Sequence, residues 1–187
     1  WLVLFWKLKI YRRPESEEKI HISTWSSGVE KVCSYRDYKL FDSENNLIAV
    51  ATSKWALYNL KELHLAKITD EIAKAFNTSN EHIFENTVYK LKEPTSTPIS
   101  EYDYTIMRRD IDTNNHVHNL NYLDIAMEAL PEDVYNNCNF SNVEVMYKHQ
   151  AVYKDKTKAF YYNINNEHYI VIKSDNLEKI HCIIKLS

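Results

Sequence analysis

Residues 119–131 read Asn-Leu-Asn-Tyr-Leu-Asp-Ile-Ala-Met-Glu-Ala-Leu-Pro and decide the fold of the second half of the chain. Their large apolar side chains recur at helical spacing: Leu120, Leu123, Met127 and Leu130. The polar stripe between them has only three members: Asn121, Asp124 and Glu128. The spacing predicts a helix over about 119–130 that ends at Pro131, and the narrow stripe predicts that other elements cover most of its surface.

Runs of β-branched, aromatic and alternating residues surround this helix and predict strands. One strand precedes the helix and four follow it: Tyr102–Arg108, then Asn142–Gln150, Lys158–Asn165, His168–Lys173 and Lys179–Leu186. One long helix wrapped by one antiparallel sheet is the hotdog architecture, an α+β fold, and we predict it for residues 101–187.

The first half of the chain predicts a second antiparallel sheet. Its runs predict four strands: around Trp6–Ile10, around Ile20–Ile22, Val29–Phe41 and Leu47–Tyr58. Turn residues separate them: Arg13–Ser16, Ser26–Gly28 and Asp42–Asn46. A short helix is predicted over Thr69–Phe76, with Thr69 as its N-cap.

The stretch 93–100 contains Pro94 and Pro98 and predicts a linker between a first hotdog domain, 1–92, and the second, 101–187. The first domain lacks a long helix, although a sheet with one apolar face must be covered. The sequence leaves open whether another chain, as in a homodimer, or a helix before Trp1 covers that face. We expect the chain to be N-terminally incomplete.

Composition excludes several classes of function. Lys plus Arg number 23 and Asp plus Glu number 26, a net charge of −3 that gives no basic excess for nucleic acid. The longest wholly apolar run, 1–6, is far short of the roughly 20 residues of a membrane span. Gly28 is the only glycine, so Gly-rich phosphate loops are absent.

The cysteines are few and far apart. Cys33, Cys138 and Cys182 form no CxxC pair, so neither a zinc ribbon nor a disulfide scaffold is indicated. We expect three small buried hydrophobes in a protein of the reducing cytoplasm.

The polar loop 110–118 is the densest candidate for chemistry. In an extended backbone Asp112, Asn114 and His116 project to one side, as a base or nucleophile, an orienting amide and a proton shuttle. The N–H groups at the start of the following helix could hold a developing oxyanion. The same residue types also suit a polar loop that only caps a helix. A metal site is not expected, because His116 and His118 have no third ligand at a recognised spacing.

Several stretches resemble the acyl-acyl carrier protein thioesterases, which include bacterial relatives of the plant enzymes. In the second half these are the loop 110–119, the Leu-Asn-Tyr-Leu that follows it and the Glu-Ala-Leu-Pro that ends at Pro131. In the first half they are Thr24–Gly28, Tyr35-Arg-Asp-Tyr and Ala51–Trp55. The resemblance implies a double hotdog whose first domain holds the acyl chain and whose second domain carries the catalytic residues.

By matching positions, the resemblance implies that Asp112, Asn114 and His116 are catalytic. The family has a further Glu on the first strand after the helix, where this chain has Gln150, and often a Cys where this chain has Ala151. The departure at Gln150 places the activation of water in question, because an amide cannot take a proton.

The resemblance implies hydrolysis of the thioester of an acyl-loaded acyl carrier protein, which releases a free fatty acid without a metal or redox cofactor. An acyl-CoA thioesterase would use the same chemistry on a nucleotide-bearing substrate. A non-catalytic acyl-binding module would keep the pocket and lose the chemistry, and Gln150 is the residue that favours this alternative. A hotdog dehydratase would need an acid and a histidine on differently placed elements, which the sequence does not offer.

Overall fold

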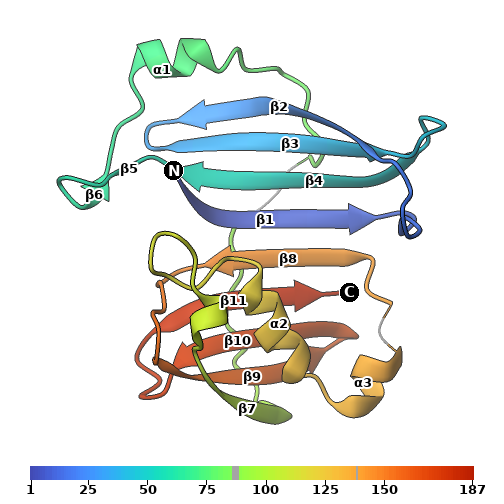
Figure 1. Cartoon of the computed structure of the whole chain (residues 1–187), viewed down its shortest axis with the longest axis vertical. Helices are drawn as coiled ribbons and strands as arrows, with labels where there is room; N and C mark the ends of the chain where they lie inside the picture. The colour runs from blue at the N-terminus through green and yellow to red at the C-terminus, as the bar shows by residue number, and fades with distance from the viewer. Residues whose placement is uncertain (86–88, 138) are drawn as a thin grey trace. The chain divides into compact units, whose positions relative to one another are not determined.

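The computed structural model describes residues 1–85, 89–137 and 139–187, and it divides into two compact units, Trp1–Tyr89 and Lys90–Ser187 (Figure 1). Each unit is built around an antiparallel sheet, so each is taken by itself below.

The first unit holds a four-stranded sheet in the order β2-β3-β4-β1, with every neighbouring pair antiparallel. Its strands are β1 Leu2–Ile10, β2 His21–Glu30, β3 Cys33–Phe41 and β4 Leu47–Ala56. A short hairpin follows, β5 Tyr58–Asn59 and β6 His64–Leu65, and then helix α1 Asp70–Ala75. The four predicted strands are confirmed. Among the described residues of this unit, α1 is the only helix.

The predicted turn at Ser26–Gly28 is wrong, because these residues lie inside β2. The register between β2 and β3 shifts there, so the local glycine and serines mark a β-bulge. A Cβ on Gly28 would come within 3.2 Å of the ring of Tyr35 on the neighbouring strand, which explains why the smallest residue stands at this point. The chain reverses instead at Lys31 and Val32, with Lys31 at φ 41°, and this turn divides the predicted run Val29–Phe41.

Helix α1 begins as predicted. The side chain of Thr69 accepts a hydrogen bond from the N–H of Ile72 at 3.3 Å, and Asp70 and Glu71 occupy the first turn. Both features stabilise the N-terminal end of a helix, where N–H groups lack partners and the dipole is positive.

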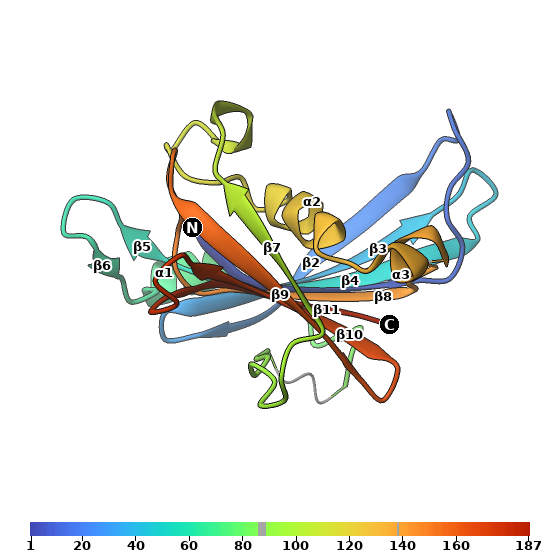
Figure 2. The ribbon, with the colours of Figure 1, turned by 90° about the horizontal axis from the view of Figure 1, so that it is seen from below.

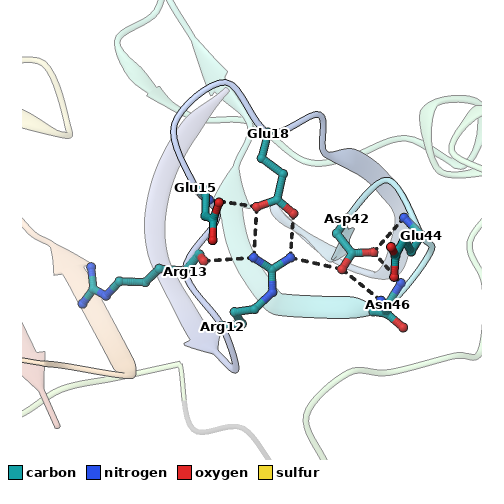
Figure 3. Close-up of polar contacts among 7 residues, drawn as sticks. All are labelled: Arg12, Arg13, Glu15, Glu18, Asp42, Glu44 and Asn46. Carbon is teal, nitrogen blue, oxygen red and sulfur yellow. Dashed lines mark hydrogen bonds and ion pairs between the residues drawn. The ribbon is translucent and has the colours of Figure 1, made fainter.

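An ion-pair cluster around Arg12 joins the β1–β2 loop to the β3–β4 turn (Figure 3). Arg12 Nη2 lies 2.6 Å from Glu18 Oε1 and 3.1 Å from Asp42 Oδ2. Asp42 Oδ1 also accepts hydrogen bonds from the N–H groups of Glu44 and Asn46, which confirms the predicted turn 42–46. The hydrogen bond from Arg12 lowers the pKa of Glu18, and those from Asn46 lower the pKa of Asp42.

The second unit holds a five-stranded antiparallel sheet in the order β8-β11-β10-β9-β7. Its strands are β7 Ser100–Thr105, β8 Asn142–Tyr147, β9 Lys156–Ile164, β10 Glu167–Ser174 and β11 Ile180–Leu186. Its helices are the short η1 Arg108–Asp110, α2 Asn121–Glu128 and α3 Glu132–Asn137. Helix α2 lies across one face of the sheet and contacts β10 and β11 (Figures 1 and 2). The predicted strand-helix-four-strand order is confirmed.

The core of this unit lies between α2 and the central strands. Tyr122, Ile125 and Ala126 of the helix are buried, as are the apolar residues of β10 and β11 beneath them. The helix begins two residues later than predicted, at Asn121. Leu120, which the sequence placed on its apolar face, is 56% exposed, so this end of the predicted helix is covered less fully than expected.

Helix α2 ends at Glu128, two residues before the predicted end at Leu130, and Pro131 precedes a second helix that the sequence did not indicate. The N–H of Tyr135 in α3 donates to the carbonyl of Pro131 at 2.9 Å. A proline fits before a helix because its missing N–H would have no partner there. The described residues include no helix long and apolar enough to cross a membrane.

Two of the cysteines lie within the described residues. Cys182 is buried, as predicted, and burial raises the pKa of its thiol. Cys33 is only half-buried, and Cys138 lies outside the described residues.

Candidate functional site

The loop between η1 and α2 is a closed turn and not the extended segment that the sequence predicted. The N–H of Asp112 donates to the carbonyl of His116 at 2.8 Å, and the N–H of Asn115 donates to the carbonyl of Asp112 at 3.1 Å. Ile111 and Val117 form a bridge below these bonds. Asn115 has φ 63°, a left-handed conformation that asparagine tolerates, which is how the loop closes.

The closed turn nevertheless brings the three predicted site residues together by a different route. Asp112 Oδ1 accepts hydrogen bonds from the backbone N–H groups of Asn114, at 2.8 Å, and His116, at 3.2 Å. Asn114 Nδ2 donates to Asp112 Oδ2 at 3.3 Å. The carboxylate is therefore the centre of the turn, and it is held in one orientation by its own loop.

These bonds also set the charge of the carboxylate. Burial alone would raise the pKa of Asp112, but the hydrogen bonds from Asn114 and His116 and the nearby His116 ring outweigh it. The pKa of Asp112 is consequently lowered from its ordinary value of 3.8. At neutral pH the loop holds a fixed negative charge.

His116, the last of the three residues, is half-buried. Its Nδ1 is buried and has no hydrogen-bond partner among residues 1–85, 89–137 and 139–187. A buried ring nitrogen normally finds a partner, so this unpaired atom sets His116 apart within the loop. A hydrogen bond between the Asn114 amide and the His116 ring, one of the two roles considered for Asn114, does not form here.

Gln150 lies past the end of β8, since the strand stops at Tyr147 and not at Gln150 as predicted. Its side chain is exposed and makes no hydrogen bond within the described part of the chain. The residue after it is fixed on both sides: the N–H of Ala151 donates to the hydroxyl of Tyr122 at 3.2 Å, and its carbonyl accepts from Val117 at 2.9 Å. Backbone contacts thus tie the Gln150 segment both to α2 and to the end of the loop.

Two residues outside the predicted set anchor the loop. Asp110 is 5% exposed, and its Oδ2 accepts hydrogen bonds from the hydroxyl of Tyr104 at 2.9 Å and the N–H of Met107 at 2.7 Å. Tyr122 holds Ala151, as described above. The sequence places both residues beside the motif, but nothing in its spacing distinguishes a buried aspartate from an exposed one.

His118 lies just before α2, whose N-cap is Leu120 with no side-chain cap hydrogen bond, and it engages two backbone amides there. Its ring Nδ1 accepts a hydrogen bond from the N–H of Leu120 at 3.3 Å, and its carbonyl accepts from Asn121 at 2.9 Å. Two amides at this end of the helix are therefore already engaged, so they do not supply the oxyanion donors that the sequence suggested. Across the described ranges, no group of three or more His, Cys, Asp or Glu residues is placed to hold a metal ion.

Comparison with known proteins identifies a family that matches both halves of the chain. Residues 1–76 match the family described as the acyl-ACP thioesterase N-terminal domain, and residues 93–185 match the acyl-ACP thioesterase C-terminal domain. Oleoyl-acyl carrier protein thioesterase 2 of Arabidopsis thaliana is 24% identical over 168 residues, which are 83% of this chain and 45% of the plant protein. The chain thus spans less than half the length of that relative.

Two solved structures share the fold over the whole chain. An acyl-ACP thioesterase of Bacteroides thetaiotaomicron has a TM-score of 0.86 at 21% identity, and this chain covers 75% of it. The 12:0-ACP thioesterase of Umbellularia californica has a TM-score of 0.86 at 16% identity, with 74% of it covered. The predicted α+β hotdog class is confirmed. With both halves matched in order, the chain belongs to the acyl-acyl carrier protein thioesterase family.

Proposed function

We propose that this protein hydrolyses the thioester of an acyl-loaded acyl carrier protein and releases a free fatty acid. The observation that carries the proposal is the closed loop, in which a fixed carboxylate charge on Asp112 adjoins His116, whose buried Nδ1 has no hydrogen-bond partner among the described residues. Asp112, Asn114 and His116 do not serve as a helix cap, because the N-cap of α2 is Leu120 and no side chain caps it.

In the proposed reaction the carbonyl carbon of the thioester is attacked, the C–S bond breaks, and the carrier thiol leaves with a proton. His116 takes the proton from water, or donates one to the leaving sulfur. Asp112 is either the charge that orients the other groups or the nucleophile; as nucleophile it forms an acyl-aspartyl anhydride as the C–S bond breaks, and water then hydrolyses this anhydride to the free acid. Asn114 holds the carboxylate through its amide, and its remaining N–H can reach the substrate carbonyl. No metal or redox cofactor takes part.

Gln150 is proposed to position the water or the substrate. An amide can donate and accept hydrogen bonds but cannot remove a proton from water, so proton transfer falls to the loop. The fixed backbone of Ala151 supports this role, since it holds the neighbouring Gln150 in place while its side chain stays accessible.

The first unit is proposed to hold the acyl chain. It has an apolar hollow lined mainly by aromatic rings: Trp1, Trp55 and Phe76, with Ser34 and Arg36 beside them. The rings of Trp1 and Phe76 meet edge to face at 5.6 Å. We also propose a reducing compartment such as the cytoplasm, because the described cysteines, Cys33 and Cys182, are free thiols.

The test is a thiol-release assay with acyl carrier protein substrates of several chain lengths, and acyl-CoA of the same chains in parallel. We expect turnover on the carrier substrates and its loss in His116→Ala by at least about 10²-fold, the usual scale for a proton-transfer group. Faster turnover on acyl-CoA would identify the CoA thioesterase alternative. Tight acyl binding without any thiol release would identify the binding module.

A further inference from the structure

We propose that the buried ring of His181 fixes the position of Gln150 at the candidate site, by binding the carbonyl of the residue before it. His181 lies on β11 and is 3% exposed. It acts through Gln150 and not on the substrate, so it is a positioning residue. The inference rests on the proposed function, in which Gln150 places the water or the substrate, and adds to it the side chain that holds Gln150 from the sheet.

The backbone ladder between β8 and β11 ends shortly before Gln150. Its last paired residues are Tyr147 and Cys182. One further backbone bond follows, in which the N–H of Lys148 donates to the carbonyl of His181 at 2.9 Å. Within the described residues, the next hydrogen bonds between the two segments come from histidine rings.

Two histidines bond reciprocally across this point. The ring Nδ1 of His181 lies 3.0 Å from the carbonyl oxygen of His149, and the ring Nδ1 of His149 lies 2.9 Å from the carbonyl oxygen of Ile180. A carbonyl oxygen can only accept, so each Nδ1 carries a proton and donates it. The two rings therefore continue the pairing of β8 with β11 where the backbone has stopped. We call His149 and His181 the histidine latch.

The burial of His181 shows that its Nδ1 bond accounts for a polar ring at this place. With the proton on Nδ1, Nε2 is a bare acceptor, and it is buried with no hydrogen-bond partner in the part of the chain that the structure describes. Such an atom costs free energy that an apolar side chain would not, and the residues that follow, 182–184, are all buried and apolar. What His181 supplies in return is the bond to the carbonyl of His149.

The histidine latch completes the hold on Gln150. The peptide group before Gln150 is bound by His181, and the N–H and carbonyl of Ala151 after it are bound by α2 and by the end of the loop. The side chain of Gln150 stays exposed, while the backbone on either side cannot rotate without breaking a hydrogen bond. Misplacing a reacting group by about 1 Å can cost about 10²-fold in rate, so this hold bears directly on the reaction.

The test replaces His181 by leucine and by asparagine. Leucine fills the buried place without a donor, so the bond to the carbonyl of His149 is lost. The amide nitrogen of asparagine stands where Nδ1 stands in histidine, so His181→Asn keeps the donor and removes the unpaired Nε2. The matched control is His168→Leu, which removes a half-buried ring of the same sheet whose Nδ1 bonds to the hydroxyl of Tyr161 at 2.8 Å. Thermal unfolding checks that each variant is folded.

Each protein is assayed for thiol release from an acyl carrier protein substrate, alone and combined with Gln150→Ala. We expect His181→Leu to lower kcat by roughly 10- to 10²-fold with KM unchanged, because the placement of a reacting group is altered and binding is not. His181→Asn should recover most of the parental kcat, and His168→Leu should keep it. In the Gln150→Ala background His181→Leu should have no further effect, since a positioning residue acts only through the residue that it positions.

Parental kcat in a folded His181→Leu variant overturns the proposal. An equal loss of kcat with and without Gln150 also overturns it, because the loss would then be a general effect on the structure.

Two measurements on the free protein separate the latch from the reaction. Nitrogen-15 NMR of the parent should show the His181 ring protonated at Nδ1 and bare at Nε2; a proton on Nε2 alone overturns the latch even if no variant folds. Amide hydrogen exchange at Ala151 should be faster in His181→Leu than in the parent or in His168→Leu. If exchange responds in this way and the parent hydrolyses no thioester, the hold on Gln150 is supported and the proposed reaction is refuted. Unchanged exchange at Ala151 overturns the hold whatever the turnover.

Discussion

Replacing Asp112 with asparagine separates the charge of this residue from its structural role. In the parent, Oδ1 accepts two backbone hydrogen bonds and Oδ2 accepts one from the Asn114 amide. The carbonyl oxygen of an asparagine can keep both backbone bonds, so Asp112→Asn should retain the closed turn. Asp112→Ala removes all three bonds and is the variant expected to loosen it.

The magnitudes follow from the number of bonds. A hydrogen bond contributes about 0.5–1.5 kcal/mol net, so Asp112→Asn should cost at most about 1 kcal/mol and Asp112→Ala roughly 2 kcal/mol in this partly exposed loop. For a chain of this size each kcal/mol lowers Tm by about 2–4 °C, so the alanine variant should unfold about 4–8 °C below the parent. If the charge serves the chemistry, Asp112→Asn should nevertheless lose at least about 10²-fold in turnover.

The assays are thiol release from acyl carrier protein and thermal unfolding across pH. The pKa of Asp112 is lower in the folded chain than its ordinary 3.8, so its charge stabilises the fold above that pH. The difference in Tm between parent and Asp112→Asn should therefore shrink as pH falls through the lowered pKa. An asparagine variant with parental turnover would show that Asp112 only shapes the loop, and would refute its catalytic assignment.

Three further outcomes are expected. Gln150→Ala should lose activity without a change in Tm, because the side chain is exposed. Gln150→Glu should stay active. Parental turnover in the alanine variant would show that Gln150 plays no part in the reaction. Tyr122→Phe should lower Tm by several degrees, since the buried N–H of Ala151 loses its acceptor at a cost of about 1–3 kcal/mol, whereas the exposed Tyr135→Phe should not. Arg12→Gln should lower Tm by a few degrees at neutral pH, and by less in acid or high salt, because its carboxylate partners become protonated or screened; an unchanged Tm at pH 7 would mean that the cluster does not stabilise the fold.

Strand β7 could be predicted because half-buried and exposed positions strictly interchange along it, as they do in a strand with one face covered. The cap of α1 could be predicted because a local side chain makes it. The bulge at Gly28 could not, since it depends on the approach of Tyr35 from another strand. Helix α3 begins directly after Pro131, and a proline at this place in the sequence indicates the end of one helix without indicating the start of the next.

In the loop 110–118, too, some features follow from the local sequence and others depend on residues far away in the chain. The residue types Asp112, Asn114 and His116 predicted one site, and the structure does bring them together in one turn, but the extended geometry inferred for them was wrong. An Asx turn competes with an extended backbone wherever Asp and Asn stand close together, and here Asn115 in a left-handed conformation decides the outcome. The anchoring of that turn by Asp110 depends on Tyr104 from a neighbouring element, which no local pattern reveals.

The geometry of the turn also indicates which residue transfers the proton in the proposed reaction. A general base works best when its pKa lies near the working pH, and the hydrogen bonds that fix Asp112 move its pKa further from neutrality. The same bonds therefore make this carboxylate a poorer proton acceptor and a better fixed charge. Since Gln150 cannot take a proton either, proton transfer in this chain falls to His116, and Asp112 is left to orient or attack. A glutamate in place of Gln150 would add a second proton acceptor beside the loop, and the Gln150→Glu variant tests whether the proposed reaction can use one.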